Sequence, residues 1–512
     1  MFDSVINGSR QVAHTLATSL LRAGVRRWYS FGPGLERSPL DNAPAQTVTQ
    51  HLVGGRPGQL APFAELPTLL ARGFVHALVN LGMPVDQELT LRAQLTAKVP
   101  VVGFVHAVPD DGQLLMRQLA APSYPCDVLF CPSESGRRVL AAHDTAFREV
   151  LGRAPFCGSV EVIPYGVMPP PPLRRAVVRK QLGWRDEDIV ILAFARLSKT
   201  FKYDATPMLL AFAEAQRRAP TLRLVLGGAA DPGYAEQLEA VASELGLASR
   251  IEIHPDVAAA ERDALYAAAD VYLAYSDSVQ ETHGIALVEA MACGLPVVAA
   301  AFDGFKEIAE GAGILLPTTF AAADAEVSAL AGLRFGDRRS PYQAEHVTID
   351  LAATVAALVS LAQEPERRAS MSAASLARVH ARYDADKNAV LVAARMQRAV
   401  SEARTMTWPV LRPNLGVNWQ ALFGHYASAP LHHVTQGPWP LERLSPEVLI
   451  ELGVATRTKV KRLIADAHVL AATPIALDAL TAQLAPRHPS LNAAAIRRWL
   501  IKACKYGVLA SA

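Results

Sequence analysis

The sequence is poor in features that mark several large classes of protein. Of its 512 residues, 19% are charged and 7% are aromatic, and 50 Lys and Arg nearly balance 48 Asp and Glu, for a net charge of +2. A general binder of polyanions would be strongly basic, so this balance argues against that class. The 32 Gly and 35 Pro are too few for a low-complexity chain. Hydrophobic residues make up 51%, which argues against a disordered protein and allows large buried cores.

Cysteine pairs and long apolar runs are also scarce. The five cysteines are odd in number and none form a C-x-x-C motif, so we expect neither a disulfide framework nor a zinc knuckle. The most apolar stretch, 285–301, contains Glu289 and Pro296, so we expect no membrane-spanning helix. The start MFDSVINGSRQ lacks the basic and apolar regions of a secretory signal. We therefore expect a cytoplasmic protein, with peripheral contact at the inner membrane face as an option.

Short apolar runs alternate with longer amphipathic stretches along most of the chain. This pattern predicts parallel sheets covered by helices on both faces. Strands are predicted at 27–31, 76–80, 99–105, 128–131, 160–163, 189–195, 222–226, 251–254, 271–275, 297–300 and 314–316. The four prolines at 169–172 resist helix and sheet and predict a hinge. We predict two doubly wound α/β domains, 1–170 and 171–385, a helix at 386–405 crossing back to the first domain, and a mainly helical accessory region, 406–512.

The strongest chemical signal is a pair of carboxylates eight positions apart, Glu281 and Glu289. They flank a predicted strand-to-helix junction where Gly284 opens the helix, and free amides at such a helix start can hold a phosphate or a sugar hydroxyl. Carboxylates bind hydroxyls well because a charged acceptor makes strong hydrogen bonds. The ordinary alternative is one surface Glu and one helix Glu. The whole block 281–308 is more specific than the spacing alone.

This block resembles the E-x7-E signature of the family 4 retaining glycosyltransferases, and SDSVQET at 276–282 resembles a sub-group with S-D-x-x-Q-E-T. The resemblance implies the GT-B fold, with two Rossmann-like domains facing a cleft. It implies that Glu281 contacts hydroxyls of the donor sugar and that Glu289 binds the nucleotide ribose. It also implies contacts to the sugar and diphosphate from Thr282, His283, Gly284 and Ile285. His283 stands where the family has Phe, so it is either a donor contact or a packing residue.

A second motif, ILAFARLSKTFKYD, places Arg196 at the end of a predicted strand and Lys202 just before a helix. In a doubly wound sheet, ligands bind beyond the carboxyl ends of the strands. Two basic side chains there could neutralise a diphosphate leaving group. The motif resembles the family's G-R-L-x-x-x-K-G with the Lys one position late, which leaves Lys199 as a rival. The alternative is a pair of ordinary surface cations.

Three more positions are candidate site residues. His106 follows the strand predicted at 99–105 and resembles the family's N-domain His near donor sugar and acceptor, although a lone His is more often structural. Gly8 resembles a glycine of the family's phosphate- or acceptor-contacting loop, with a plain helix cap by Ser9 as the alternative. Gly228 ends a strand and is expected near the nucleotide base. Around Tyr165, the sequence VIPYGV resembles the family's hinge motif I-P-N-G-V.

The resemblance implies transfer of a sugar from a nucleotide donor, with UDP- or GDP-sugar favoured, to an unidentified acceptor with retention of configuration. It implies neither a metal nor another cofactor, because basic side chains can balance the diphosphate. The alternatives are a phosphorylase or synthase of the same architecture, or a non-catalytic binding protein. Residues 406–512 carry a net charge of +6, which predicts either a docking surface for an anionic or protein partner or a packing appendage. Its predicted basic helix face comprises Arg497, Arg498, Lys502 and Lys505, and its predicted packing residues are Trp408, Trp419 and Trp439.

Overall fold

The computed structural model describes much of the chain, and its residues divide into two compact units. Unit 1 lies within Pro169–Arg378 and Asn418–Ala512, and unit 2 within Asn7–Met168 and Val379–Val417. The structure describes residues 15, 19, 20, 22, 27–33, 49–55, 77–80, 89, 92, 98–106, 123–152, 154, 156–168, 170–199, 202–279, 281–321, 344–407, 429–452, 454, 458–491 and 493–512.

Unit 1 is built around a parallel six-stranded sheet with the order β12-β11-β10-β7-β8-β9. Its strands are β7 (Ile189–Phe194), β8 (Leu222–Gly228), β9 (Ile251–Pro255), β10 (Val271–Ala274), β11 (Val297–Ala300) and β12 (Ile314–Leu316). Most are apolar throughout and buried, as strands covered on both faces must be. The sheet grows in one direction from β7 through β8 and β9, and in the other from β10 through β11 and β12. The order in which strands are added therefore reverses between β7 and β10, which is the topological switch point of a Rossmann-type sheet.

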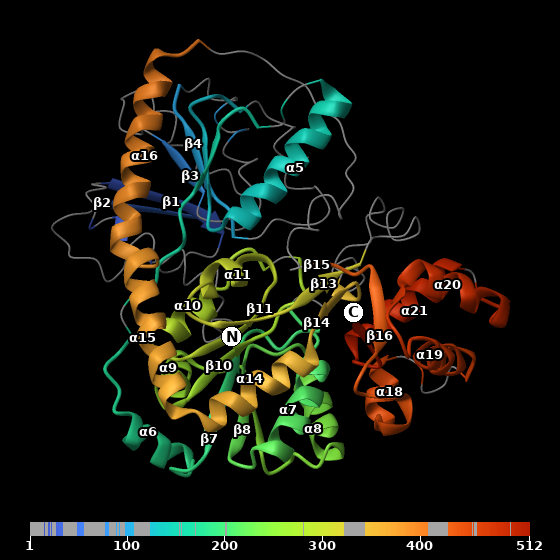
Figure 1. The fold of residues 1–512 in the computed structure, drawn as a ribbon. Helices are drawn as coiled ribbons and strands as arrows, with labels where there is room; N and C mark the ends of the chain where they lie inside the picture. The colour runs from blue at the N-terminus through green and yellow to red at the C-terminus, as the bar shows by residue number, and fades with distance from the viewer. Residues whose placement is uncertain are drawn as a thin grey trace. The chain divides into compact units, whose positions relative to one another are not determined.

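Helices connect these strands and cover the sheet (Figure 1). The connecting helices are α7 (Thr206–Arg218), α8 (Tyr234–Glu244), α9 (Ala259–Ala268), α10 (Ile285–Ala292) and α11 (Asp303–Ala309). Helix α6 (Arg175–Leu182) precedes β7, and α14 (Leu351–Gln363) and α15 (Pro365–Arg382) follow β12. Helix α7 buries most of its residues, among them Met208, Leu209 and Phe212, in the core that it shares with the sheet. Because each crossover helix starts just beyond a strand's carboxyl end, the helix N-termini gather at one edge of the sheet.

The C-terminal residues add two small sheets and a group of short helices. The order is β14-β13-β15 in one sheet and β17-β16-β18 in the other. The strands are β13 (Thr318–Phe320), β14 (Val347–Ile349), β15 (Ala429–Pro430), β16 (His433–Gln436), β17 (Ile475–Ala476) and β18 (Leu509–Ser511). The helices are η4 (Leu441–Arg443), α18 (Pro446–Leu452), α19 (Thr458–Leu470), α20 (Leu477–Leu484), η5 (Ala485–Arg487) and α21 (Ala493–Lys505).

These C-terminal helices share a hydrophobic core with the six-stranded sheet. Leu209 of α7, Leu358 of α14, Leu463 of α19 and Leu500 of α21 are fully buried members of one apolar cluster. Trp439 packs against the same cluster, and the other two predicted packing tryptophans, Trp408 and Trp419, lie outside the described residues. Since burial of shared apolar surface is the main stabilising contribution, this region is folded together with the sheet rather than beside it.

Unit 2 contains a four-stranded parallel sheet with the order β3-β4-β5-β6, and a parallel pair, β1 and β2. The strands are β1 (Arg27–Pro33), β2 (Thr49–Gly55), β3 (Leu78–Asn80), β4 (Val101–Phe104), β5 (Val128–Cys131) and β6 (Ser159–Val162), and the helices are α5 (Glu134–Leu151) and α16 (Ala385–Thr405). Helix α5 begins where Ser133 Oγ accepts a hydrogen bond from the Gly136 amide at 3.0 Å, and ends at Gly152 with φ 67°.

The segment at the end of β6 packs closely against the start of α16. A Cβ atom on Gly166 would lie 2.4 Å from both Cα and N of Ala385, so only glycine fits between the two backbones. Arg395 Nε donates to Glu161 Oε1 at 3.0 Å and ties α16 to β6. These contacts make α16 part of unit 2, although it lies more than 200 residues after β6 in sequence.

The buried imidazole of His143 predicts a pH dependence for the stability of unit 2. His143 lies on α5 with 1% exposure, and within the described residues neither ring nitrogen has a hydrogen-bond partner. Burial lowers the pKa of His143 to about 3. In the unfolded chain this imidazole has a pKa near 6.5, so it takes up a proton there at a pH at which the folded chain does not. The contribution of neutral His143 to the free energy of unfolding is therefore complete above pH 6.5 and is lost as the pH falls. We expect it to lower the free energy of unfolding by roughly 1.4 kcal/mol per pH unit below about pH 6.

Urea unfolding of the wild type and of His143→Phe between pH 8 and pH 4 measures this effect. The Phe variant keeps a ring beside Phe147 but cannot titrate. The two stability profiles should run parallel above pH 7 and diverge below it, and parallel profiles over the whole range would contradict the assignment.

Among the described residues, none of the helices combines the length and apolarity that crossing a bilayer requires. The predicted strands 128–131, 297–300 and 314–316 have the bounds of β5, β11 and β12. β2 and the short strands β13 to β18 were not predicted. Several of these short strands span only two or three residues, too short for a period of alternation to be visible.

Candidate functional site

An ion pair joins the two sides of the switch point in unit 1. Lys202 follows β7 and Glu281 follows β10, and these strands are neighbours in the sheet. Lys202 Nζ donates to Glu281 Oε2 at 2.7 Å, with side-chain exposures of 30% and 14%. The amide of Lys202 donates to the carbonyl of Ser198 at 3.0 Å, and that of Glu281 to the carbonyl of Ser278 at 3.1 Å. Two turns thus present opposite charges at the edge where such sheets bind ligands.

The second carboxylate, Glu289, lies in the helix that follows Glu281. Most of α10 is buried, including Leu287, Val288 and Met291, and Glu289 is its one charged residue. Tyr266 Oη donates to the Ala286 carbonyl at 3.1 Å and lies 3.4 Å from Glu289 Oε2, and the Arg262 guanidinium lies 3.6 Å from Oε1. Both partners belong to α9, so the carboxylate is oriented by side chains from a separate element. A carboxylate fixed in this way can accept hydrogen bonds from hydroxyl groups.

Gly284 allows α10 to begin where it does. It has φ +99°, and a Cβ atom there would lie 2.3 Å from the ring of Phe305 on α11. The amides of Leu287 and Val288 already donate to the Gly284 carbonyl. Thr282 is fully buried and His283 is 5% exposed, so the His283 ring packs in the interior. The glycine therefore sets the close packing of α10 against α11 beside the two carboxylates.

Arg196, Lys199 and Lys202 have different surroundings although they lie in one short loop. Arg196 is exposed at the end of β7. Lys199 Nζ lies 3.5 Å from Asp204 Oδ2 and 3.3 Å from Tyr506 Oη. Lys202, by contrast, reaches Glu281. Of the two rival lysines, Lys202 is the one that pairs with the signature carboxylate.

Gly228, expected near a nucleotide base, has a packing reason to be glycine. It has φ +139°, and a Cβ atom there would lie 1.9 Å from the Ala195 carbonyl oxygen. The ends of β7 and β8 come this close because Leu197 N donates to the Ala229 carbonyl at 2.7 Å. The close approach of two backbones is enough to explain this residue.

His106 belongs to unit 2 and lies two residues after β4. Its ring centroid is 5.2 Å from that of Tyr165, and Tyr165 Oη donates to the Val105 carbonyl at 2.8 Å. Burial raises the pKa of Tyr165 well above its usual value, so it stays a neutral donor. Tyr165 thus supports the backbone from which His106 projects. Gly8, the remaining predicted site residue of this part of the chain, lies outside the described residues.

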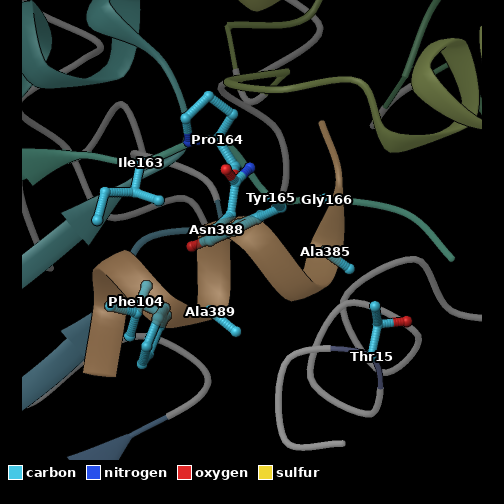
Figure 2. A pocket seen from close by; sticks show the side chains of 10 residues that line it. Thr15, Phe104, Ile163, Pro164, Tyr165, Gly166, Ala385, Asn388 and Ala389 are labelled. Carbon is cyan, nitrogen blue, oxygen red and sulfur yellow. The ribbon is translucent and has the colours of Figure 1, made fainter. Parts of the chain in front are cut away.

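A pocket in unit 2 lies where the segment after β6 meets α16 (Figure 2). Asn388 Nδ2 donates to the Pro164 carbonyl at 2.9 Å at this junction. The pocket offers about 20 Å³, which is room for roughly one water molecule. A sugar or nucleotide does not fit, so this pocket is not the candidate site. Its lining residues are Thr15, Phe104, Ile163, Pro164, Tyr165, Gly166, Ala385, Asn388, Ala389 and Val392.

The prediction of an exposed basic face on α21 is wrong for Lys505. Lys505 is 7% exposed and its Nζ donates to Asp277 Oδ2 at 2.5 Å. Arg497 and Arg498 pair with Asp478 and Glu345 respectively. The helix faces inward here because the tail shares the core of unit 1. The contact between Lys505 and Asp277 links residues 228 positions apart, and nothing in the local sequence around either residue predicts it.

Read from β9, the sheet order is β9-β8-β7-β10-β11-β12, which is 3-2-1-4-5-6 when these six strands are numbered along the chain. This order, with a charged pair at its switch point, defines a Rossmann-type α/β domain. Solved structures share the fold of this chain, parallel sheets with helices in two domains, which is the GT-B fold. The HepE protein of Anabaena, solved with UDP and glucose, is 19% identical, has a TM-score of 0.51, and matches 77% of this chain and 96% of its own. Sucrose-phosphate synthase of Thermosynechococcus elongatus is 18% identical with a TM-score of 0.53, over 78% of this chain and 96% of its own.

Comparison with known sequences identifies the family of this protein. Residues 175–331 match the family model described as glycosyl transferases group 1. A D-inositol 3-phosphate glycosyltransferase of Kineococcus radiotolerans is 30% identical over 344 residues, 59% of this chain and 77% of the relative. The protein belongs to the group 1 glycosyl transferases. Other relatives match over a shorter part of their length. The D-inositol 3-phosphate glycosyltransferase of Xylanimonas cellulosilytica is 33% identical over 158 residues, which is 29% of this chain and 36% of the relative.

Proposed function

We propose that this protein transfers a sugar from a nucleoside diphosphate to an acceptor with retention of anomeric configuration. The Lys202–Glu281 pair at the switch point, with Glu289 on the following helix, carries the proposal. UDP is the favoured nucleotide, because a solved protein of the same fold holds UDP and glucose. The relatives named D-inositol 3-phosphate glycosyltransferase support a small polyol phosphate as one acceptor class to test.

The proposed chemistry breaks the bond between the anomeric carbon and the diphosphate oxygen. Positive charge develops on the sugar and negative charge on the diphosphate. Lys202, Arg196 and the amides at the start of α10 stabilise the diphosphate electrostatically, which makes a metal ion unnecessary in this proposal. Glu281 accepts hydrogen bonds from sugar hydroxyls and Glu289 from the ribose. The acceptor hydroxyl attacks on the face that the diphosphate leaves, so the configuration is retained. Its proton passes to the departing diphosphate oxygen, so no dedicated side-chain base is assigned.

Nucleotide binding is the first test. We expect UDP or GDP to raise the melting temperature of the full chain, because a ligand at one hundred times its Kd stabilises the folded state by about 2.7 kcal/mol. Transfer or hydrolysis of a UDP-sugar without added phosphate separates a transferase from a phosphorylase. If none of UDP, GDP and ADP changed the melting temperature of the protein, the result would contradict the proposal.

Replacing Glu289 with Gln should weaken nucleotide binding. The amide keeps the shape of the side chain but loses the charged acceptor that would bind the ribose hydroxyls. We expect the Kd for UDP, measured by calorimetry, to rise about tenfold. Glu239→Gln, on the exposed part of α8, is the matched control and should bind as the wild type does. An unchanged Kd in Glu289→Gln would remove the ribose role.

A further inference from the structure

The C-terminal end of α21 reaches the two segments that carry the candidate site. Helix α21 ends at Lys505, and Tyr506 and Gly507 follow, with Gly507 at φ 70°. Lys505 is 7% exposed and Tyr506 is fully buried. A Cβ atom on Gly507 would lie 2.4 Å from the Trp439 ring, so the chain turns at a position where only glycine fits. These residues are not used by the chemistry proposed above.

The carboxylate of Asp277 joins three separate parts of unit 1. Its Oδ2 accepts from Lys505 Nζ at 2.5 Å and from the backbone amide of Asp204 at 3.2 Å. Asp204 lies two residues after Lys202, and Asp277 lies four residues before Glu281. The carboxylate therefore fixes the loop after β7 against the segment after β10. These are the two segments that must meet for Lys202 to reach Glu281.

Tyr506 makes a second connection to the same loop. Its Oη donates to Asp204 Oδ2 at 2.6 Å and accepts from Lys199 Nζ at 3.3 Å. The other oxygen of Asp204 accepts from the Thr206 amide at 3.0 Å, at the start of α7. Asp204 is thus held by the Tyr506 hydroxyl on one side and by the Thr206 amide at the start of α7 on the other.

The two lysines of this cluster, Lys199 and Lys505, balance its two carboxylates, Asp204 and Asp277. They do so only when the C-terminal helix is packed against the two loops. Burial alone would lower the pKa of Lys505, but the carboxylates of Asp277 and Asp204 more than offset this and raise it. Burial would raise the pKa of Asp204, but the ammonium groups of Lys199 and Lys505 and the Tyr506 hydroxyl hold it below its usual range. A buried charge without its partner is costly. The hydrogen bonds of Lys505, Tyr506 and Asp204 link the segments that supply them, although Asp277 Oδ1 has no partner among the described residues.

We infer that Lys505 and Tyr506 are positioning residues of the donor site, holding the Lys202 loop and the Glu281 segment in the arrangement that binds the nucleotide sugar. The inference rests on the proposed function. It gives the C-terminal region a role in substrate binding inside unit 1, in place of a surface for an external anionic partner.

Two full-length variants test this role. Tyr506→Phe removes one hydroxyl and leaves the ring in place. Lys505→Met combined with Asp277→Asn removes both charges of the pair, so that neither charge is left buried alone. For each variant we expect the Kd for UDP and the KM for the sugar donor to rise roughly tenfold, through loss of hydrogen bonds to charged groups.

The matched control is Leu500→Ala in the same helix. Leu500 is fully buried in the shared core and is apolar, so its truncation lowers the melting temperature without touching the polar cluster. Below its melting temperature it should bind UDP within twofold of the wild type, whereas Tyr506→Phe should lose affinity with a smaller change in melting temperature. A merely structural role would instead make affinity follow stability in all three variants.

The outcomes separate this inference from the proposed function. Wild-type protein that binds UDP, with variants that bind it equally well, overturns the inference alone. Wild-type protein that binds none of UDP, GDP and ADP overturns the proposed function and the inference with it. Weaker UDP binding in both polar variants, with the Leu500→Ala control unchanged, supports the positioning role.

Discussion

Glu281→Gln is expected to reduce kcat/KM for sugar transfer by about 10²–10³-fold, the range seen when one preorganised electrostatic contact is removed from an active site. The carboxylate is 14% exposed and lies 2.7 Å from Lys202 Nζ at the switch point. The Gln side chain has the same shape but cannot carry the charge that orients Lys202 and accepts hydrogen bonds from sugar hydroxyls. Since Lys202 remains 30% exposed, solvent can compensate the lysine, and the variant should stay folded.

Initial rates with a UDP-sugar, together with the melting temperature, measure this effect. Glu261→Gln is the matched control, because Glu261 lies on α9 with 43% side-chain exposure and pairs with His254 instead. The control should keep kcat/KM within threefold of the wild type, a change of under about 1 kcal/mol. If Glu281→Gln transferred sugar as fast as the control, Glu281 would have no role in catalysis.

Arg92→Met should destabilise unit 2 by about 3–5 kcal/mol, the usual cost of leaving one partner of a buried ion pair alone. Arg92 is 1% exposed and Asp127 is fully buried. The guanidinium donates to both carboxylate oxygens, at 2.5 and 2.9 Å, and Asp127 also accepts from the amides of Val101 and Tyr124 at 2.8 and 2.7 Å. These contacts hold the starts of β4 and β5. In Arg92→Met the buried carboxylate of Asp127 would lose its only cation among the described residues.

Chemical denaturation followed by a probe in unit 2 measures this loss. The matched control is Arg22→Met, which removes an exposed pair with Asp386 at 3.0 Å, with side-chain exposures of 54% and 49%. An exposed pair contributes up to about 1 kcal/mol, so the control should be close to the wild type. Equal losses in the two variants would mean that burial does not control the cost of the Arg92 pair.

Much of the architecture could be predicted from local pattern. Apolar runs such as 297–300 and 314–316 can form only buried strands when helices separate them, and they are β11 and β12 in the structure. Gly284, at the strand-to-helix junction between Glu281 and Glu289, was expected to open α10, and it does so because φ +99° suits glycine. These features depend on neighbours a few residues away, which is the range over which a sequence pattern is informative.

The reasons behind other residues could not be predicted in this way. Gly228 and Gly166 are glycines because another backbone lies within reach of where a Cβ would be, at Ala195 and Ala385. Which carboxylate Lys199 and Lys202 each meet, Asp204 or Glu281, is a second such case. Both questions concern distances between segments, which a one-dimensional pattern does not contain.

The sequence by itself determined the succession of strands and helices, the two signature carboxylates and the basic loop before α7, because spacing and residue type act locally. Only the tertiary structure decided that β7 and β10 are neighbours, which brings Lys202 to Glu281 across 79 positions. It also decided between the docking surface and the packing appendage for Lys505 of the predicted basic helix, which lies in the interior and pairs with Asp277. The physical reason is burial: the tail shares its apolar core with the sheet, and a lysine carried inside must meet a carboxylate.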